Sequence, residues 1–443
     1  MNLKQSKLVF YLLIALSGQA QSDLSASDAV FTALENNYEI VISQKQLEIT
    51  QTNNSWSEAG AFPTVDLSVM NGYSLQDNSN NEAPFTIQGL ILNQSITPSL
   101  NTNWNIFNGF AVRISKLRLE QLEQQSANNA MAIIENTVQD VLKAYYTAQL
   151  QNERKGLFEN IMALSRNKVN YYELKEKYSG SNSLELLQFK NQYLTDSTNY
   201  LLQKISCENA LRNLVLLMND TTIAIDKMKL TDELDQRLID ADFSNVQEEM
   251  LANNQNLKNQ YISLELQKTN TSFQRSFLYP TLNFQAGVNP NWATLREIKD
   301  SNFEATSNNI SYYGNLNLRF SLFNNWKNKR AVEVSKIQEE IGSMNIESMK
   351  QTLSSTLKNL ISLYKTRAQL ADISKENLIY STKALKLAED RFNVGSINSI
   401  EFSGFQNNYQ NTLIQHYENL FNKLDTYLEI YKMTGRIGLK YTN

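Results

Sequence analysis

The chain has 443 residues, with 41 Lys or Arg against 45 Asp or Glu, and a formal net charge of −4. This mildly acidic charge pattern predicts no nucleic-acid partner. With a single cysteine, Cys207, and a single histidine, His416, the chain cannot form an internal disulfide, a zinc constellation or a histidine-dependent catalytic triad. We therefore expect no enzyme activity, no cofactor and no metal site.

The first 20 residues are typical of a secretory signal peptide. Two lysines precede an apolar run over residues 8–16, and Gly18 and Ala20 form a small-x-small cleavage site. We expect cleavage after Ala20 and export from the cytoplasm. In the rest of the chain, no apolar run reaches the roughly 18 to 20 residues of a membrane-spanning helix.

The remainder of the chain is a duplication of one unit, predicted over residues 21–242 and 243–443. Three sequence pairs indicate it: FPTVDL at 62 and YPTLNF at 279, WNIFNGF at 104 and FSLFNNW at 320, and NSLE at 182 and NSIE at 398. Such self-similarity is the signature of an internal repeat. Each copy is predicted to run helix, strand, loop, strand, very long helix, tip, helix, so the fold is expected to be mainly α with β.

All five prolines lie in two windows, residues 62–108 and 279–323, where the strands are predicted. Strict alternation of apolar and polar residues predicts strands over residues 64–75, 99–107, 281–292 and 310–322. This alternation fits either a half-buried sheet of a soluble protein or the wall of a lipid-facing barrel. The polar faces are almost all Asn, Ser and Thr, and strands of about ten residues can cross a membrane when tilted, so the barrel is favoured.

Four strands cannot close a barrel, and an open sheet edge cannot lie in hydrocarbon, so several copies must share one barrel. Three copies would give twelve strands, an even number within the known range for membrane barrels, so this step predicts an obligate oligomer. Trp104, Trp292 and Trp326 lie near the predicted strand ends and suit a membrane-interface girdle. Ordinary packing of aromatic residues within a sheet explains these three residues equally well.

Two very long helices are predicted over residues 111–177 and 327–393, each on the order of 100 Å long at a rise of about 1.5 Å per residue. Their apolar residues recur at steps of three and four, which leaves a narrow apolar seam between polar faces. A hollow helical cylinder that continues the barrel satisfies this pattern, and so does a solid coiled-coil stalk.

Each long helix is predicted to turn back through a short tip, over residues 178–185 and 392–401. Gly180 and Gly395 suit the left-handed backbone conformation that ends a helix. Each tip is therefore expected to be a helix hairpin.

A second feature of the tips is an asparagine three residues before a glutamate. Asn182 precedes Glu185 in this way, and Asn398 precedes Glu401, which resembles a capping box with Asn in the place of Ser or Thr. The glutamates are interpreted either as helix caps only or as a ring of carboxylates at an aperture where symmetric hairpins converge. The two interpretations are compatible.

The order and duplication of these motifs resemble the TolC family of outer-membrane efflux proteins. RFNVGSINSIEF at 391 looks like the family's periplasmic tip, and DAVFTALENN at 28, the two [FY]-Pro-Thr strand openings, WNIFNGF, and MTG near the C-terminus support the resemblance. It implies a homotrimer in which a twelve-stranded outer-membrane β-barrel continues into an α-helical barrel that forms a periplasmic tunnel. It also implies docking to a periplasmic adaptor (membrane fusion) protein, which links the duct to an inner-membrane pump.

Residue roles follow from the same resemblance. It places Glu185 and Glu401 at the periplasmic aperture. It places five further residues at the adaptor-docking tip: Gly180, Ser181, Val394, Gly395 and Ser396.

The tip also departs from the family's pattern. Gly404 stands where family members often carry a second acid, and Ile397 stands where some carry a basic residue that locks the tip. The family's closed-state lock and its adaptor register are therefore not carried over to this chain.

The predicted function is a passive exit duct of a tripartite efflux or type I secretion system, with porin activity. The expected location is the outer membrane, with a long periplasmic portion and outer-membrane lipid around the barrel. Two alternatives stay open at this point. One is the same fold used for protein secretion or metal export, and the other is a secreted helical stalk or adhesin with a β head.

Overall fold

The computed structural model describes residues 22–80, 88–179, 183–220, 225, 228–234, 245–298 and 304–437. Three predicted features lie outside these ranges: the signal peptide, the boundary between the repeats at residue 242, and the tip residues Gly180, Ser181 and Asn182. The chain divides into two units. The helical unit comprises residues 1–45, 128–259 and 347–443, and the second unit, residues 46–127 and 260–346, contains the large sheet.

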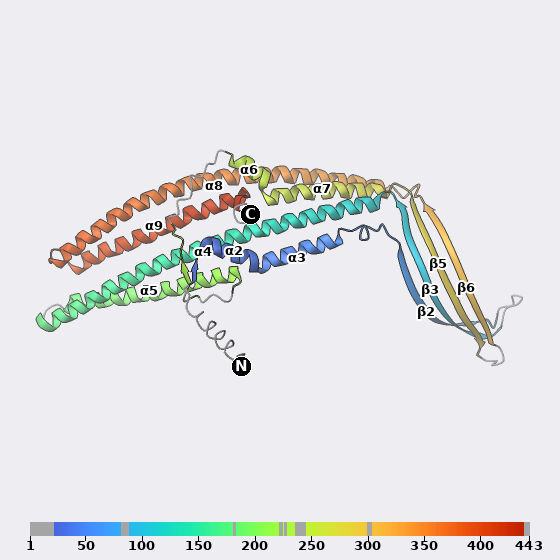
Figure 1. Cartoon of the computed structure of the whole chain (residues 1–443), viewed down its shortest axis with the longest axis horizontal. Coiled ribbons are helices and arrows are strands. Elements are labelled where there is room, and N and C mark those ends of the chain that lie inside the picture. The colour runs from blue at the N-terminus through green and yellow to red at the C-terminus, as the bar shows by residue number, and fades with distance from the viewer. Residues whose placement is uncertain are drawn as a thin grey trace, which may run out of the picture. The chain divides into compact units, whose positions relative to one another are not determined.

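The same order of elements occurs twice along the chain (Figure 1). The first copy contains β1 (Ser22–Leu24), α2 (Ala26–Asn36), α3 (Tyr38–Asn53), β2 (Thr64–Asp77), β3 (Leu90–Asn108), α4 (Ala111–Ser179) and α5 (Ser183–Met218). The second copy contains β4 (Met228–Leu230), α6 (Val246–Asn253), α7 (Gln255–Ser276), β5 (Thr281–Glu297), β6 (Glu304–Arg319), α8 (Lys327–Asn393) and α9 (Ser399–Met433). The predicted duplication is confirmed.

The two predicted long helices are also confirmed, because α4 and α8 contain 69 and 67 residues and begin at the predicted positions. Neither helix contains a proline, which would remove a backbone hydrogen bond and clash with the preceding turn. None of the described helices is both long enough and apolar enough to cross a membrane.

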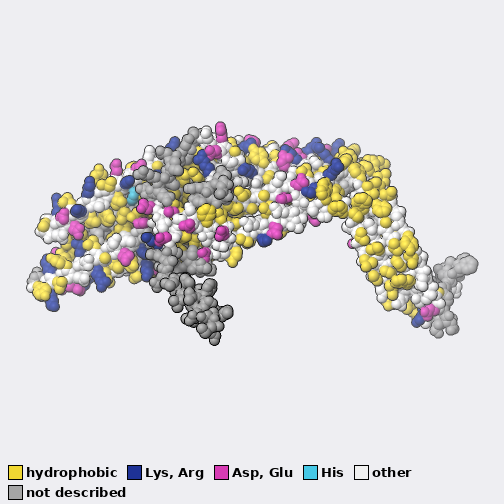
Figure 2. Space-filling model, in the orientation of Figure 1, with side chains coloured by type: hydrophobic (Ala, Val, Ile, Leu, Met, Phe, Trp, Pro, Cys, Tyr) yellow, Lys and Arg dark blue, Asp and Glu magenta, His cyan; other side chains and the backbone are white. Residues whose placement is uncertain are grey.

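The large sheet is antiparallel throughout, in the order β2-β3-β5-β6. One row of residues across its four strands is apolar: Leu67, Leu100, Val288 and Tyr312. A row on the opposite face is polar: Thr64, Asn103, Gln285 and Asn315. Successive side chains of a strand point to opposite faces, so the alternation in the sequence becomes one apolar and one polar face. Figure 2 shows hydrophobic side chains spread over these strands.

The predicted strand length of about ten residues is wrong, because the strands contain 14 to 19 residues. β3 begins well before the predicted start, since Pro98 does not interrupt it. In the register between β3 and β5, Pro98 falls opposite Pro290, and the pairing skips from Ile96–Trp292 to Leu100–Val288. A proline has no N–H to donate, so two opposed prolines share one gap in the hydrogen-bond ladder. β6 ends at Arg319, three residues before the predicted end.

In the helical unit, the long helices lie in the order α5-α4-α9-α8 (Figure 1). The α5 residue Gln203 donates to the α4 carbonyl of Gln151 at 3.0 Å, and the α9 hydroxyl of Tyr417 donates to the α4 residue Glu153 at 3.3 Å. The largest core cluster draws residues from α2, α4, α5 and α9. At its centre, the fully buried Tyr145 donates to the carbonyl of Leu24 at 2.8 Å and so ties α4 to β1.

Candidate functional site at the hairpin tips

The second tip ends α8 with a Schellman motif centred on Gly395. The N–H of Ser396 donates to the carbonyl of Arg391 at 2.9 Å, and the N–H of Gly395 donates to the carbonyl of Phe392 at 3.0 Å. Gly395 has a φ of +75°, the left-handed conformation that this motif requires and that glycine adopts without steric cost. The exposed Val394 and the polar Ser396 therefore lie at the end of the hairpin.

A capping box starts α9 directly after this turn. The side chain of Asn398 accepts from the N–H of Glu401 at 2.9 Å, and the carboxylate of Glu401 accepts from the N–H of Asn398 at 3.0 Å. Glu401 is exposed, so one carboxylate oxygen holds the cap while the other can face solvent. The geometry is thus compatible with both interpretations of Glu401.

At the first tip, the structure describes Glu185 in the first turn of α5 and Tyr172 near the end of α4. Burial, and after it the charge of Glu185, raises the pKa of the Tyr172 hydroxyl. Tyr172 packs against Phe189 with ring centres 4.8 Å apart, and both belong to a small core cluster at this end of the unit.

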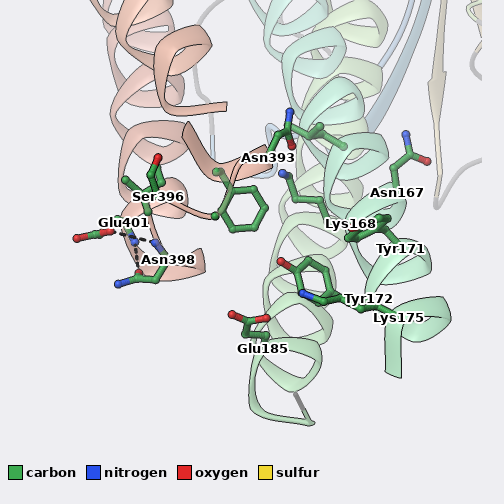
Figure 3. Close-up of a pocket in the computed structure, with 14 residues that line it drawn as sticks. Asn167, Lys168, Tyr171, Tyr172, Lys175, Glu185, Asn393, Ser396, Asn398 and Glu401 are labelled. Atoms are coloured by element: carbon green, nitrogen blue, oxygen red, sulfur yellow. Dashed lines mark hydrogen bonds between the residues drawn. The ribbon is translucent and has the colours of Figure 1, made fainter. Parts of the chain in front are cut away.

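A groove of about 560 Å³ runs between the two hairpins, lined by residues of α4, α5, the second tip and α9. Glu185 and Glu401 both line it, one from each hairpin (Figure 3). Ser399 at the start of α9 donates to Gln188 of α5 at 2.7 Å, which joins the hairpins beside the groove. The structure therefore brings the two predicted glutamates to one groove within a single chain.

A lysine that the sequence analysis missed forms a second link between the hairpins. The ammonium nitrogen of Lys168, on α4, lies 4.4 Å from the ring centre of Phe392 and 3.9 Å from that of Phe402. The two rings are 5.1 Å apart. Burial lowers the pKa of Lys168, and the charge of Glu389 opposes this shift. The only signal in the sequence is a phenylalanine on each side of the tip, which does not indicate a cation.

Comparison with known proteins decides the family. The family model described as "Outer membrane efflux protein" matches residues 30–220 and 246–436, one match for each repeat. The chain belongs to the outer membrane efflux protein family. An outer membrane efflux protein is a channel of the outer membrane and not an enzyme.

Solved structures show that this outer membrane efflux protein has the fold of known channels. The outer membrane channel CmeC of Campylobacter jejuni is 13% identical, with a TM-score of 0.73 over 95% of this chain and 90% of that one. The open state of MtrE from Neisseria gonorrhoeae is 16% identical, with a TM-score of 0.71 over 94% and 90%. CusC is 14% identical, with a TM-score of 0.71 over 95% of both chains. Comparison with curated protein sequences gives no match.

Of the three predicted interface tryptophans of the outer membrane efflux protein, Trp104 and Trp292 lie at different levels of the sheet and Trp326 lies beyond it. Trp104 lies four positions before the end of β3 and donates to the carbonyl of Ala61 at 3.0 Å. Trp292 lies toward the other end of β5, and Trp326 directly precedes α8. Their exposed fractions are 41%, 47% and 59%. Among the residues that the structure describes, no group of three or more His, Cys, Asp or Glu side chains could hold a metal ion.

Proposed function

We propose that three copies of the chain form one passive exit duct through the outer membrane. Cargo would come from an inner-membrane pump through a periplasmic adaptor, in an efflux or type I secretion system. The duct opens and closes at its helical tips. The observation that carries the proposal is that the large sheet is incomplete in one chain.

The incomplete sheet has two open edges and an uncovered apolar face. β2 and β6 each pair on one side only among the described strands, and nearly all their residues are exposed. Leu67 and Tyr312, at the two ends of one apolar row, are 75% and 74% exposed. An open edge cannot lie in hydrocarbon, so the edges must pair with other copies, and three sets of four strands close an even barrel of twelve.

The two outer helices in the order α5-α4-α9-α8, namely α5 and α8, also support a ring of copies. α5 exposes leucines at a seven-residue spacing: Leu187, Leu194 and Leu201. α8 exposes apolar residues at the same spacing: Ile373, Tyr380 and Leu387. A seven-residue apolar repeat is the pattern of a helix that packs along a partner helix. Pairing of α5 with α8 of the next copy would cover both seams.

The girdle predicted for the tryptophans fits a barrel of this kind. Phe284 lies opposite Trp104 on β5, and Trp292 is eight residues further along that strand. Eight residues of strand extend about 27 Å, which is close to the height of the apolar band of an outer-membrane barrel before strand tilt is considered.

The gate is proposed at the tips. In a trimer, three copies of Glu185 and Glu401 surround one aperture, where a ring of carboxylates favours cations. The adaptor is proposed to grip the exposed turn at Val394, Gly395 and Ser396, together with Gly180 and Ser181 of the first tip.

The test is to extract the protein from membranes in detergent, measure its mass by light scattering and record single-channel currents. We expect a particle of three chains with a small, cation-selective conductance. A water-soluble monomer without current would overturn the proposal and would favour the helical stalk.

A further inference from the structure

Each repeat holds an exposed aromatic residue in the left-handed backbone region where the sheet meets a long helix. Phe110 has a φ of 68° and follows Gly109 at 64°, and Trp326 has a φ of 60° and follows Asn325 at 56°. This conformation is disfavoured for a residue with a Cβ. Both side chains nevertheless remain more than half exposed, at 52% and 59%. The strained turns therefore present aromatic rings to the surroundings at equivalent places in the two repeats.

These two rings belong to a larger exposed group, which we call the junction patch. It consists of Phe110, Tyr279, Phe320, Leu322, Phe323 and Trp326, all at least half exposed. Phe110 packs edge-on against Tyr279 at 6.1 Å, and Trp326 packs edge-on against Phe323 at 5.9 Å. The paired strands β5 and β6 bring both groups to the same end of the sheet, where Figure 2 shows a dense area of hydrophobic side chains.

Basic residues follow the junction patch directly on both long helices. They are Arg113 and Arg118 on α4, and Lys327, Lys329 and Arg330 on α8. All five are exposed, and none forms an ion pair with any residue that the structure describes. The first acidic residues of these helices, Glu120 and Glu333, come only after them.

These basic residues do not stabilise the helices that carry them. A basic residue in the first turns of a helix opposes the helix dipole, and neither helix has an acidic residue in its first turn. The ammonium nitrogen of Lys329 lies 5.2 Å from the ring centre of Trp326, so charge and aromatic surface meet. Asn328 also donates to the carbonyl of Phe277 at 2.7 Å, which fixes the start of α8 against the end of α7.

We propose that the junction patch and these five basic residues bind anionic phospholipid in the bilayer leaflet nearest the long helices. This inference rests on the proposed membrane barrel. The apolar face of β6 continues past its last residue, Arg319, into Phe320 and Leu322, so the patch is continuous with the surface assigned to lipid. Aromatic side chains favour the headgroup level, and basic residues beside them attract phosphate. The five basic residues have no ion-pair partner among the described residues, so their positive charge favours anionic over zwitterionic headgroups.

The test uses the purified full-length protein in vesicles of equal parts phosphatidylglycerol and phosphatidylcholine, followed by native mass spectrometry of the lipids that it retains. We expect the wild type to retain phosphatidylglycerol preferentially. The triple variant Lys327→Gln, Lys329→Gln, Arg330→Gln should reduce the ratio of the two lipids at least about tenfold, because each basic residue near an anionic surface contributes to the attraction. Its fold should persist, since the removed charges oppose the helix dipole.

A matched triple variant removes three exposed lysines from another part of α8: Lys375→Gln, Lys383→Gln and Lys386→Gln. This variant should leave the lipid ratio unchanged. A wild type without preference, or an equal loss in both triple variants, would overturn the inference. The same spectra report the number of chains, so a trimer without lipid preference defeats this inference alone, whereas a monomer defeats the proposed function.

Discussion

The ammonium nitrogen of Lys168 lies 3.9 Å from the ring centre of Phe402, which holds a side chain of α4 against the first turn of α9. The same nitrogen is 4.4 Å from the ring centre of Phe392, near the end of α8. A cation over aromatic rings is attracted by their quadrupoles, more strongly when it is partly withdrawn from water. Any movement that separates the two hairpins must break this contact.

Replacement of Lys168 by Met removes the cation and keeps most of the aliphatic chain. Because a contact of this kind contributes about 1 kcal/mol, we expect Lys168→Met to raise the ratio of open to closed channel about fivefold in planar bilayers. Lys168→Arg should stay close to the wild type. The control is Lys175→Met, since Lys175 contacts Tyr172 on the same helix at 5.1 Å. Equal effects of Lys168→Met and Lys175→Met would show that the contact does not hold the tip closed.

The two functions assigned to Glu401 can be separated by substitution. Gln at this position still completes the capping box, so Glu401→Gln should keep α9 intact while it reduces the preference for cations. Asn398→Ala should do the opposite, with a loss of about 1 kcal/mol in local helix stability and no change in selectivity. Reversal potentials across a salt gradient and hydrogen exchange at the start of α9 measure the two effects. An unchanged reversal potential in Glu401→Gln would leave the residue as a cap only.

Asp196 gives an expectation about pH. Its side chain is 2% exposed on α5, where it accepts hydrogen bonds from Ser165 and Gln192. Burial raises the pKa of this carboxyl above its ordinary value, and the two hydrogen bonds oppose the shift. The folded protein therefore binds the proton more tightly than the unfolded chain, so stability falls as the pH rises through the window between the two pKa values.

The side chain of Asn does not ionise, so Asp196→Asn does not lose stability as the pH rises. We therefore expect this variant to have a higher thermal midpoint than the wild type at about pH 7.5. The difference should shrink at about pH 3, below the ordinary pKa of an aspartate, where the wild-type carboxyl is protonated in the folded state. The exposed Asp372 on α8 supplies the control variant Asp372→Asn. A destabilised Asp196→Asn at both pH values would mean that the hydrogen bonds outweigh the burial of charge.

The exposed seam on α5 gives an expectation about assembly. Leu194 is 64% exposed in one chain, and the proposed ring buries it against α8 of the next copy. Leu194→Lys should therefore weaken the trimer at least about tenfold, because an unpaired charge is costly to bury. Thr195→Lys adds the same charge at the adjacent exposed position and should have little effect. Light scattering over a dilution series measures both, and an equally stable trimer in Leu194→Lys would remove α5 from the interface.

Much of the fold follows from local sequence pattern. The absence of proline and the narrow apolar seam predict α4 and α8 closely, because a helix is defined by contacts between residues three and four positions apart. The start of β3 is not predictable in this way, since Pro98 lies inside the strand and its lost hydrogen bond falls opposite Pro290 on another strand. The strand boundary depends on a pairing partner that no local pattern contains.

In the candidate site too, local geometry is predictable from the sequence and long-range contacts are not. The turn at Gly395 and the cap of Asn398 on Glu401 involve residues a few positions apart, so their geometry can be anticipated from the sequence. Lys168 and its two phenylalanines come from opposite halves of the duplicated chain. Neither composition nor spacing indicates that contact, because it exists only once the two hairpins are packed together.

The two open edges of the sheet have a consequence for the folding and assembly of the protein. A single chain outside the ring carries β2 and β6 with unpaired backbone groups and an exposed apolar face, the features that promote aggregation. Under the proposed arrangement, completing the fold and finding two further copies are therefore one event. The yield of functional duct should rise steeply with the local concentration of new chains, and a cell that makes this protein must shield each newly exported copy until its neighbours arrive.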